Sequence, residues 1–140
     1  MFYRHNNRPE AAKNRKRLLL VEDNKSMLSL LTNILSNEFE VQSFTCANEA
    51  IEWIADGTNR VDVIVSDVNL DNSTGIDLAK HLETCQVSGH IPLIFLSGMD
   101  KGYMEKISGG FSYAAYINKP FNPGSLIDQI KEVTEPVYQL

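Results

Sequence analysis

The sequence predicts an α/β protein built on a parallel sheet of five strands, with helices on both faces. Short apolar segments alternate five times with segments of helical periodicity, and this order is typical of parallel strands joined by right-handed crossovers. The clearest strand covers residues 61–67, where a β-branched run suited to burial on both faces ends in Asp67. The 140 residues correspond to one domain without an internal repeat.

The first strand–helix unit begins at residue 17. The segment from Arg17 to Val21 is short and apolar, and Asn24 is placed to cap the helix that follows it. The apolar residues of this helix recur at helical spacing: Met27, Leu28, Leu31, Ile34 and Leu35. We expect a second strand at residues 39–44.

The second helix is expected to begin at Ala47 or Asn48 and to be closed by the Asp56-Gly57 pair. Trp53 on this helix is interpreted as a residue that packs the helix against the sheet. After the third strand, we expect a loop over residues 68–74.

The third helix begins at Gly75 in this interpretation. Its apolar face consists of Ile76, Leu78, Ala79 and Leu82. His81 is expected to be a solvated histidine of the same helix rather than a phosphorylatable one, and His5 and His90 form no set of metal ligands with it. The Gly89-His90 pair ends the helix, and residues 91–98 form a fourth buried strand, with Pro92 tolerated near its start.

A fourth helix and a fifth strand come next. Residues 100–108 form a polar, moderately amphipathic helix, and residues 113–118 form a strand that Lys119-Pro120 stops. Asn122 and Pro123 have the types expected at the start of the last helix. Its apolar face consists of Leu126, Ile127, Ile130 and Val133.

Charge is distributed unevenly along the chain. Residues 1–17 hold six basic and one acidic side chain, and the rest holds seven basic and seventeen acidic ones, so the two parts carry net charges of +5 and −10. We expect residues 1–16 to form a flexible basic tail and residues 136–140 a C-terminal tail, which leaves a domain at 17–135. The acidic balance of this domain argues against direct binding of nucleic acid.

Composition also bears on location. The apolar runs 18–21 and 91–96 are far shorter than the roughly 20 residues that cross a bilayer, so we expect no membrane insertion. The acidic pair after the first run argues against a secretion signal. Cys46 and Cys85 lack the spacing of metal ligands, and reduced cysteines favour a cytoplasmic protein.

Polar side chains follow four of the five strands at their carboxyl ends. Glu22 and Asp23 follow the first strand, Asp67 ends the third, Ser97 ends the fourth and Lys119 follows the fifth. The carboxyl ends of parallel strands share one edge, where open α/β sheets bind ligands, so we expect these side chains to converge. Crowded carboxylates are costly without a cation, and Mg²⁺ prefers oxygen ligands of this kind.

This set of residue types suits phosphoryl transfer. Mg²⁺, a lysine and a hydroxyl group stabilise a transferring phosphoryl group, and a carboxylate can accept one. We therefore predict that Asp67 is a phosphoryl acceptor. The alternative, a strand-end aspartate that only shapes the next loop, does not explain the placing of Asp23, Ser97 and Lys119.

Four motifs of the chain resemble those of receiver domains in the two-component response-regulator family. They are Leu19-Leu20-Val21-Glu22-Asp23-Asn24, Val65-Ser66-Asp67-Val68-Asn69-Leu70 with Gly75 eight residues after Asp67, Ile94-Phe95-Leu96-Ser97-Gly98, and Tyr116-Ile117-Asn118-Lys119-Pro120-Phe121. The resemblance covers residues 17 to about 135 and is to the stand-alone type of receiver found in chemotaxis regulators. It implies a flavodoxin-like fold with strand order 2-1-3-4-5.

The resemblance implies roles for individual residues of the metal and acceptor site. Asp67 is the phosphorylated aspartate and also belongs to the Mg²⁺ site. Asp23 binds Mg²⁺ directly, Glu22 binds it mainly through water, and Asn69 offers its backbone carbonyl. Lys119 pairs with the phosphoryl group.

The family's switch is implied as well. Ser97 is the switch hydroxyl, and Tyr116 is the aromatic residue that changes rotamer with it. The Lys119–Pro120 peptide bond is expected to be cis. A protein of this kind is a signalling phosphoacceptor rather than an enzyme, with only self-catalysed phosphorylation and slow autodephosphorylation.

Several positions depart from the family pattern. Asp71 stands where many relatives have proline, and Ser112 where many have glycine. Asn69 and Met99 occupy the positions that, in this family, modulate access of the hydrolytic water. The lifetime of the phosphoryl group is left open by these residues.

The resemblance implies a sensor histidine kinase or a histidine phosphotransfer protein as the phosphodonor. A downstream protein is expected on the face of the fourth helix, fifth strand and fifth helix, which also often forms homodimers. No output domain is evident after the last helix, so we expect the signal to pass to another protein.

Two other functions stay open at this point. One is a receiver-shaped interaction module that works without phosphorylation, which the altered loop at Asp71 motivates. The other is an aspartyl-phosphate hydrolase, which Asn69 disfavours because it stands where such an enzyme has its general acid.

Overall fold

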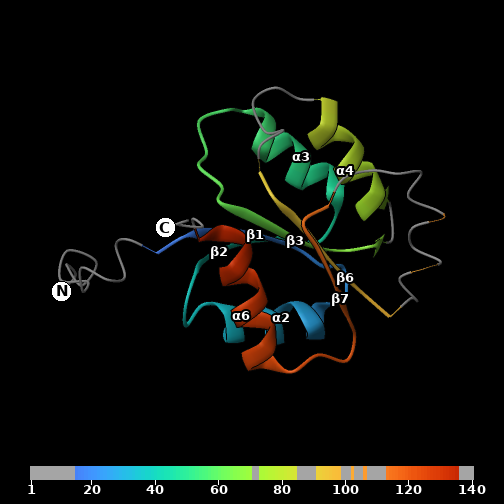
Figure 1. The fold of residues 1–140 in the computed structure, drawn as a ribbon. Helices are drawn as coiled ribbons and strands as arrows, with labels where there is room; N and C mark the ends of the chain where they lie inside the picture. Colours follow the sequence, from blue (N-terminus) through green and yellow to red (C-terminus); the bar gives the residue numbers. More distant parts are fainter. Residues whose placement is uncertain are drawn as a thin grey trace, which may run out of the picture.

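A single parallel sheet of five strands forms the centre of the protein, as a computed structural model shows (Figure 1). The structure describes residues 15–70, 73–84, 91–98, 102, 106 and 113–135. The strands are β1 (Arg17–Val21), β2 (Glu40–Phe44), β3 (Val63–Asp67), β6 (Leu93–Ser97) and β7 (Ala115–Asn118). Their order is β2-β1-β3-β6-β7, with every neighbouring pair parallel. The predicted flavodoxin-like order is therefore confirmed.

Helices cover both faces of this sheet, as predicted. On one face lie α2 (Lys25–Leu35) and α6 (Pro123–Thr134), and on the other lie α3 (Ala47–Ala55) and α4 (Gly75–Thr84) (Figure 1). Each helix contributes to the hydrophobic core on its own side of the sheet. The molecule thus has three layers, with the sheet in the middle.

Strand β1 shows why both cores form. Leu18 and Leu20 belong to the core under α2 and α6, whereas Leu19 and Val21 belong to the core under α3 and α4. All four side chains are fully buried, because successive residues of a strand point to opposite faces. Burying a leucine or valine completely stabilises the fold by about 1.5–3 kcal/mol.

The helix ends follow the local sequence. The Asn24 side chain accepts a hydrogen bond from the Met27 backbone N–H at 2.8 Å, and Asn122 accepts one from the Ser125 N–H at 3.0 Å. Pro123 occupies the first turn of α6. At the end of α3, Gly57 has a positive φ of 78°, a conformation that glycine adopts without strain. The two predicted caps are confirmed.

Several strands begin later than the apolar runs indicate. The third strand was expected from residue 61 and the fourth from residue 91, but β3 begins at Val63 and β6 at Leu93. Val61 and Ile91 are nonetheless buried in the core. An apolar residue indicates that a position is buried, but where a strand begins depends on hydrogen bonds to the neighbouring strand. Buried residues can therefore precede the strand, which explains the late starts of β3 and β6. The second and fifth strands are shorter at their starts in the same way.

The loop expected over residues 68–74 contains regular structure that was not predicted. This segment contains a two-stranded antiparallel ribbon of β4 (Asn69–Leu70) and β5 (Ser73–Thr74). Strands of two residues are too short to show an alternating pattern of apolar and polar residues. Sequence periodicity therefore offered no signal for them.

The expectation that His81 is solvated was wrong, whereas the expectation that Trp53 packs its helix against the sheet is confirmed. His81 is half-buried, and its Nε2 atom is buried without a hydrogen-bond partner among the described residues. It lies three residues after buried Leu78 on α4 and so borders the buried face of the helix. Trp53 packs against the core, with its ring centroid 5.9 Å from that of Phe44.

Some predictions fall outside the described residues. These are residues 1–14 of the expected N-terminal tail, the C-terminal tail, the Gly89-His90 helix end, and the positions Asp71, Cys85, Met99 and Ser112. The last two residues of the expected N-terminal tail are described and contact the fold: Arg15 donates to the Ser36 carbonyl at 2.8 Å, and the Lys16 carbonyl accepts from the Glu40 N–H at 2.9 Å. Of the helix expected at 100–108, only Gly102 and Lys106 are described, and both are helical. Within the described ranges, no helix combines the length and the apolar composition needed to cross a bilayer.

Candidate functional site

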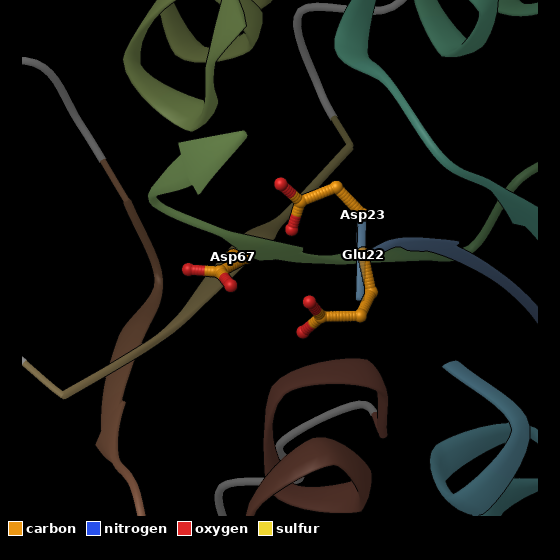
Figure 2. Close-up of side chains that lie close together, drawn as sticks. All are labelled: Glu22, Asp23 and Asp67. Atoms are coloured by element: carbon orange, nitrogen blue, oxygen red, sulfur yellow. The ribbon is translucent and has the colours of Figure 1, made fainter. Parts of the chain in front are cut away.

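Three carboxylates meet at the carboxyl edge of the sheet. Glu22 and Asp23 directly follow β1, and Asp67 is the last residue of the adjacent strand β3. One carboxylate oxygen from each side chain lies within 4.8 Å of the others. Figure 2 shows the three side chains grouped where the two strands end. The parallel pairing of β1 with β3 is what brings these acids together.

Glu22 is the most deeply buried of the three acids, with 1% of its surface exposed. One carboxylate oxygen, Oε2, accepts a hydrogen bond from the Asn24 backbone N–H at 3.1 Å. The other, Oε1, lies 3.2 Å from the Lys119 Nζ atom. The Glu22 N–H donates to the Phe44 carbonyl at 3.0 Å, which ties this residue to the end of β2.

Lys119 links the acids of the two strands. Its Nζ atom contacts Asp67 Oδ2 at 3.0 Å in addition to Glu22. The Lys119 backbone N–H donates to the Ser97 carbonyl at 2.9 Å, so the end of β6 positions the lysine. The Lys119–Pro120 peptide bond is cis, as predicted. Lys119 thereby contacts Glu22 across a separation of 97 positions in the chain.

The pKa values of these groups reflect crowding of like charge in a partly buried place. Burial raises the pKa of Glu22 above its ordinary value, and the nearby Asp67 charge adds to this, while the Asn24 N–H and Lys119 oppose it. Burial by itself would lower the pKa of Lys119, but its hydrogen bonds and ion pairs with Asp67 and Glu22 outweigh that effect and raise the pKa. Lys119 is therefore charged at neutral pH.

The donor set fits a hard divalent cation. Three carboxylates and one ammonium group leave excess negative charge when all are ionised, and an added cation offsets it. All the clustered donors are oxygen atoms, which Mg²⁺ prefers over nitrogen or sulfur. Asn69 begins β4 two residues after Asp67, and its backbone carbonyl stays a predicted ligand. The acidic cluster is typical of the magnesium site of receiver domains.

Ser97 and Tyr116 lie near this group but differ in their surroundings. Ser97 ends β6, has 2% of its surface exposed, and is in register with Asn118, the residue before Lys119. Tyr116 is half-buried and packs against the core under α3 and α4, with its ring centroid 6.4 Å from that of Tyr113. Their roles as a switch pair stay predictions.

A cleft of about 430 Å³ opens beside the acids. It is lined by Glu22, Asp23, Asn24, Ser26, Met27, Leu30, Asp67 and Lys119. The lining contributed by α2 was missed from the sequence, although Ser26, Met27 and Leu30 lie on neighbouring positions of its first turns. Leu30 is 49% exposed. Its position outside the apolar stripe of the helix was the one feature of the sequence that could have indicated this part of the cleft.

Comparisons with known proteins agree with this arrangement. Residues 18–131 match the family model described as the response regulator receiver domain. The chain is 31% identical to the regulatory protein VanRc of Enterococcus gallinarum over 119 residues, covering 83% of this chain and 48% of that protein. It is 28% identical to the chemotaxis protein CheY of Halobacterium salinarum, covering 84% of this chain and 96% of that one. The chain thus spans about half of VanRc but nearly all of this CheY.

Solved structures show the same fold. Chemotaxis protein CheY4 of Vibrio cholerae has a TM-score of 0.73 and 26% identity, covering 85% of this chain and 98% of that one. The phosphorylated cyanobacterial phytochrome response regulator RcpA has a TM-score of 0.71 and 25% identity, covering 85% and 91%. The family model covers most of the chain, and the fold and acidic edge agree with it. The chain therefore belongs to the response regulator receiver family and contains a receiver domain of two-component signalling.

Proposed function

We propose that Asp67 accepts a phosphoryl group in a Mg²⁺-dependent reaction. The observation that carries this proposal is the contact of Lys119 with Asp67 inside the acidic cluster. A lysine held on the acceptor carboxylate can bind an oxygen of the incoming phosphoryl group, and neighbouring acids can hold the metal. Asp67 is also partly accessible, with 15% of its side chain exposed beside the cleft.

The chemistry proposed for the chain is an in-line transfer from a phosphohistidine. A carboxylate oxygen of Asp67 forms the new bond to phosphorus while the phosphorus–nitrogen bond of the donor breaks, and the histidine nitrogen keeps the electron pair. Lys119 and Ser97 bind oxygens of the transferred group. Bound Mg²⁺, held by Glu22, Asp23, Asp67 and the Asn69 carbonyl, would offset the negative charge of the acids and the phosphoryl group.

We propose a sensor histidine kinase or a histidine phosphotransfer protein as donor. Contacts to the phosphoryl group then favour a state in which Ser97 and Tyr116 have moved, which changes the surface formed by the helix expected at 100–108, β7 and α6. A downstream protein or a second copy of the chain binds that surface. In this proposal residues 17–135 form the receiver domain, and the protein functions in the cytoplasm. It accepts a phosphoryl group but does not turn over other substrates.

The decisive experiment is intact mass measurement after incubation with acetyl phosphate, with and without Mg²⁺. The protein is expected to gain one phosphate only with Mg²⁺, and Asp67→Asn is expected to gain none. Arg60→Ala, on the opposite edge of the sheet, is the matched control and should behave as wild type. Equal phosphate uptake by wild type and Asp67→Asn would refute the proposal. A pull-down in each state then tests the output, and partner binding indifferent to Mg²⁺ and phosphodonor would favour a phosphorylation-independent interaction module.

A further inference from the structure

Ser66 is a fully buried polar residue that the proposed reaction does not use. It lies in β3 directly before Asp67, and none of its surface is exposed. On the neighbouring strand β6, its partner in register is the buried Phe95. A hydroxyl group in such apolar surroundings is unfavourable unless it forms a hydrogen bond. What the Ser66 hydroxyl binds is therefore informative.

The hydroxyl of Ser66 donates to the backbone carbonyl of Asp67, with 2.8 Å between Oγ and O. The acceptor is thus the main chain of the proposed phosphoacceptor itself. A local bond of this kind restrains rotation of the peptide that follows Asp67. That peptide also leads to Asn69, which is the predicted carbonyl ligand two residues later.

Gly75 closes on the same carbonyl from another side. A Cβ atom at position 75 would lie 2.4 Å from Asp67 O, 3.0 Å from the Phe95 ring and 3.2 Å from Ser66 Oγ. The first of these is a backbone atom, so a side chain there requires the Asp67 carbonyl to move. The Gly75 N–H also donates to the Val68 carbonyl at 2.7 Å. The carbonyl groups of Asp67 and Val68 therefore accept hydrogen bonds from Ser66 and Gly75, respectively.

We propose that Ser66 is a positioning residue for the phosphoacceptor: its hydroxyl holds the Asp67 carbonyl in a space that glycine at position 75 leaves open. The inference rests on the proposed function, since it assigns Ser66 a part in the same site. In this proposal Ser66 is not a ligand of the metal or of the phosphoryl group, since its hydroxyl is bonded to the Asp67 carbonyl. It acts through the main chain, which sets where the Asp67 carboxylate meets Lys119 and the other acids.

The test compares Ser66→Ala, Gly75→Ala and Val63→Ala with wild type. Val63 is equally buried on the same strand but lies at its start, four residues before Asp67, so Val63→Ala controls for general loss of packing. Three quantities are measured: the Mg²⁺ dissociation constant by calorimetry, the rate of phosphate uptake from acetyl phosphate, and the carbonyl ¹³C resonance of Asp67 without metal. Urea unfolding gives the stability of each variant.

Ser66→Ala is expected to move the Asp67 carbonyl resonance, and to weaken Mg²⁺ binding and slow phosphate uptake roughly two- to tenfold, the effect of losing one hydrogen bond. Gly75→Ala should act in the same direction and more strongly. If Gly75→Ala does not fold, Ser66→Ala and Val63→Ala carry the test. Val63→Ala should lose stability without changing Mg²⁺ affinity or uptake.

The inference is overturned if Ser66→Ala equals wild type in Mg²⁺ affinity and uptake, or if Val63→Ala loses as much of both. Failure of the proposed function gives a different result: wild type then takes up no phosphate. Even so, a weaker Mg²⁺ affinity and a moved carbonyl resonance in Ser66→Ala would still support the positioning role.

Discussion

The two edges of the sheet use charge in different ways. At the amino edge, Arg17 pairs with Glu40 at 3.1 Å and Arg60 pairs with Asp62, so positive and negative charges balance. At the carboxyl edge, Lys119 contacts two carboxylates of a group of three. Each of these two pairs at the amino edge joins one positive and one negative charge, whereas the three carboxylates and one lysine of the carboxyl edge carry an excess of negative charge when ionised.

Burial sharpens this difference. The paired side chains at the amino edge are between 23% and 56% exposed, so water screens their interactions. At the carboxyl edge the Glu22 side chain is 2% exposed and the Lys119 side chain 23%. Unbalanced charge in a partly buried place is costly unless a ligand corrects it. The carboxyl edge therefore has the charge and burial expected of a cation site, whereas the exposed pairs of the amino edge neutralise each other.

Removing the positive charge of Lys119 from the carboxyl edge should have the largest effect on phosphate uptake. Lys119→Ala is expected to slow phosphate uptake from acetyl phosphate on the order of 100-fold, because one preorganised group that stabilises the transferring phosphoryl group is lost. Uptake is followed by intact mass over time at saturating Mg²⁺. Arg60→Ala removes a cation from the amino edge and serves as the control. Similar rates for the two variants would erase the distinction between the edges.

Adding a cation should stabilise the protein through the carboxyl edge. If Mg²⁺ binds only the folded state, a concentration of 100 times its dissociation constant raises the free energy of unfolding by about 2.7 kcal/mol. Asp23→Asn should abolish most of this gain, since it removes a carboxylate from the cluster. Thermal or urea unfolding with Mg²⁺ or with a chelator measures it. An unchanged gain in Asp23→Asn would exclude this carboxylate as a ligand.

The buried acid of the carboxyl edge should make stability depend on pH. The pKa of Glu22 is raised from 4.5, so the folded chain holds this proton more tightly than the unfolded chain. Its contribution is therefore most favourable at low pH and declines as pH rises above about 4.5 through the folded pKa. Lys119, whose pKa is raised from 10.5, loses its contribution only at higher pH.

Glu22→Gln should remove this decline. Without Mg²⁺, wild type is expected to lose stability relative to Glu22→Gln as the pH rises from 4.5 to neutral, because the folded chain holds the Glu22 proton more tightly than the unfolded chain does. Urea unfolding in chelator across that range measures the difference. Parallel pH profiles for the two proteins would show that Glu22 does not titrate with a raised pKa.

The smallest effect is expected at the amino edge. Arg60→Ala breaks the pair with Asp62, in which the arginine side chain is 56% exposed. Exposed pairs of this kind contribute about 0.5 kcal/mol, and salt screens them. The loss in unfolding free energy should shrink at high salt. A loss several times larger, or one that salt does not reduce, would mean that this edge also depends on a buried charge.

Much of the fold was predictable because its signals are local. The caps at Asn24 and Asn122, the alternation of strands with helices and the acids after two strands are all legible in short segments. The convergence of Glu22, Asp67 and Lys119 was also predictable, since parallel strands place their carboxyl ends at one edge. In a parallel sheet, residues that end different strands therefore come together in one site.

Other features depend on neighbours far away in the chain. The late starts of β3 and β6, the β4–β5 ribbon and the buried Nε2 of His81 had no distinct pattern in the sequence. Contacts within the site also depend on distant segments. The Ser66 hydroxyl and the backbone of Gly75 both lie close to the Asp67 carbonyl because α4 begins next to the end of β3.

The sequence by itself determined the class of fold, the helix caps and the residue types available at the carboxyl edge, because periodicity and capping act within a few residues. Only the tertiary structure decided how one lysine is shared between Glu22 and Asp67, how deeply each acid is buried, and which atoms hold the main chain at Asp67. Burial and charge pairing are set by all the segments that pack around a group, and short-range patterns do not contain that information.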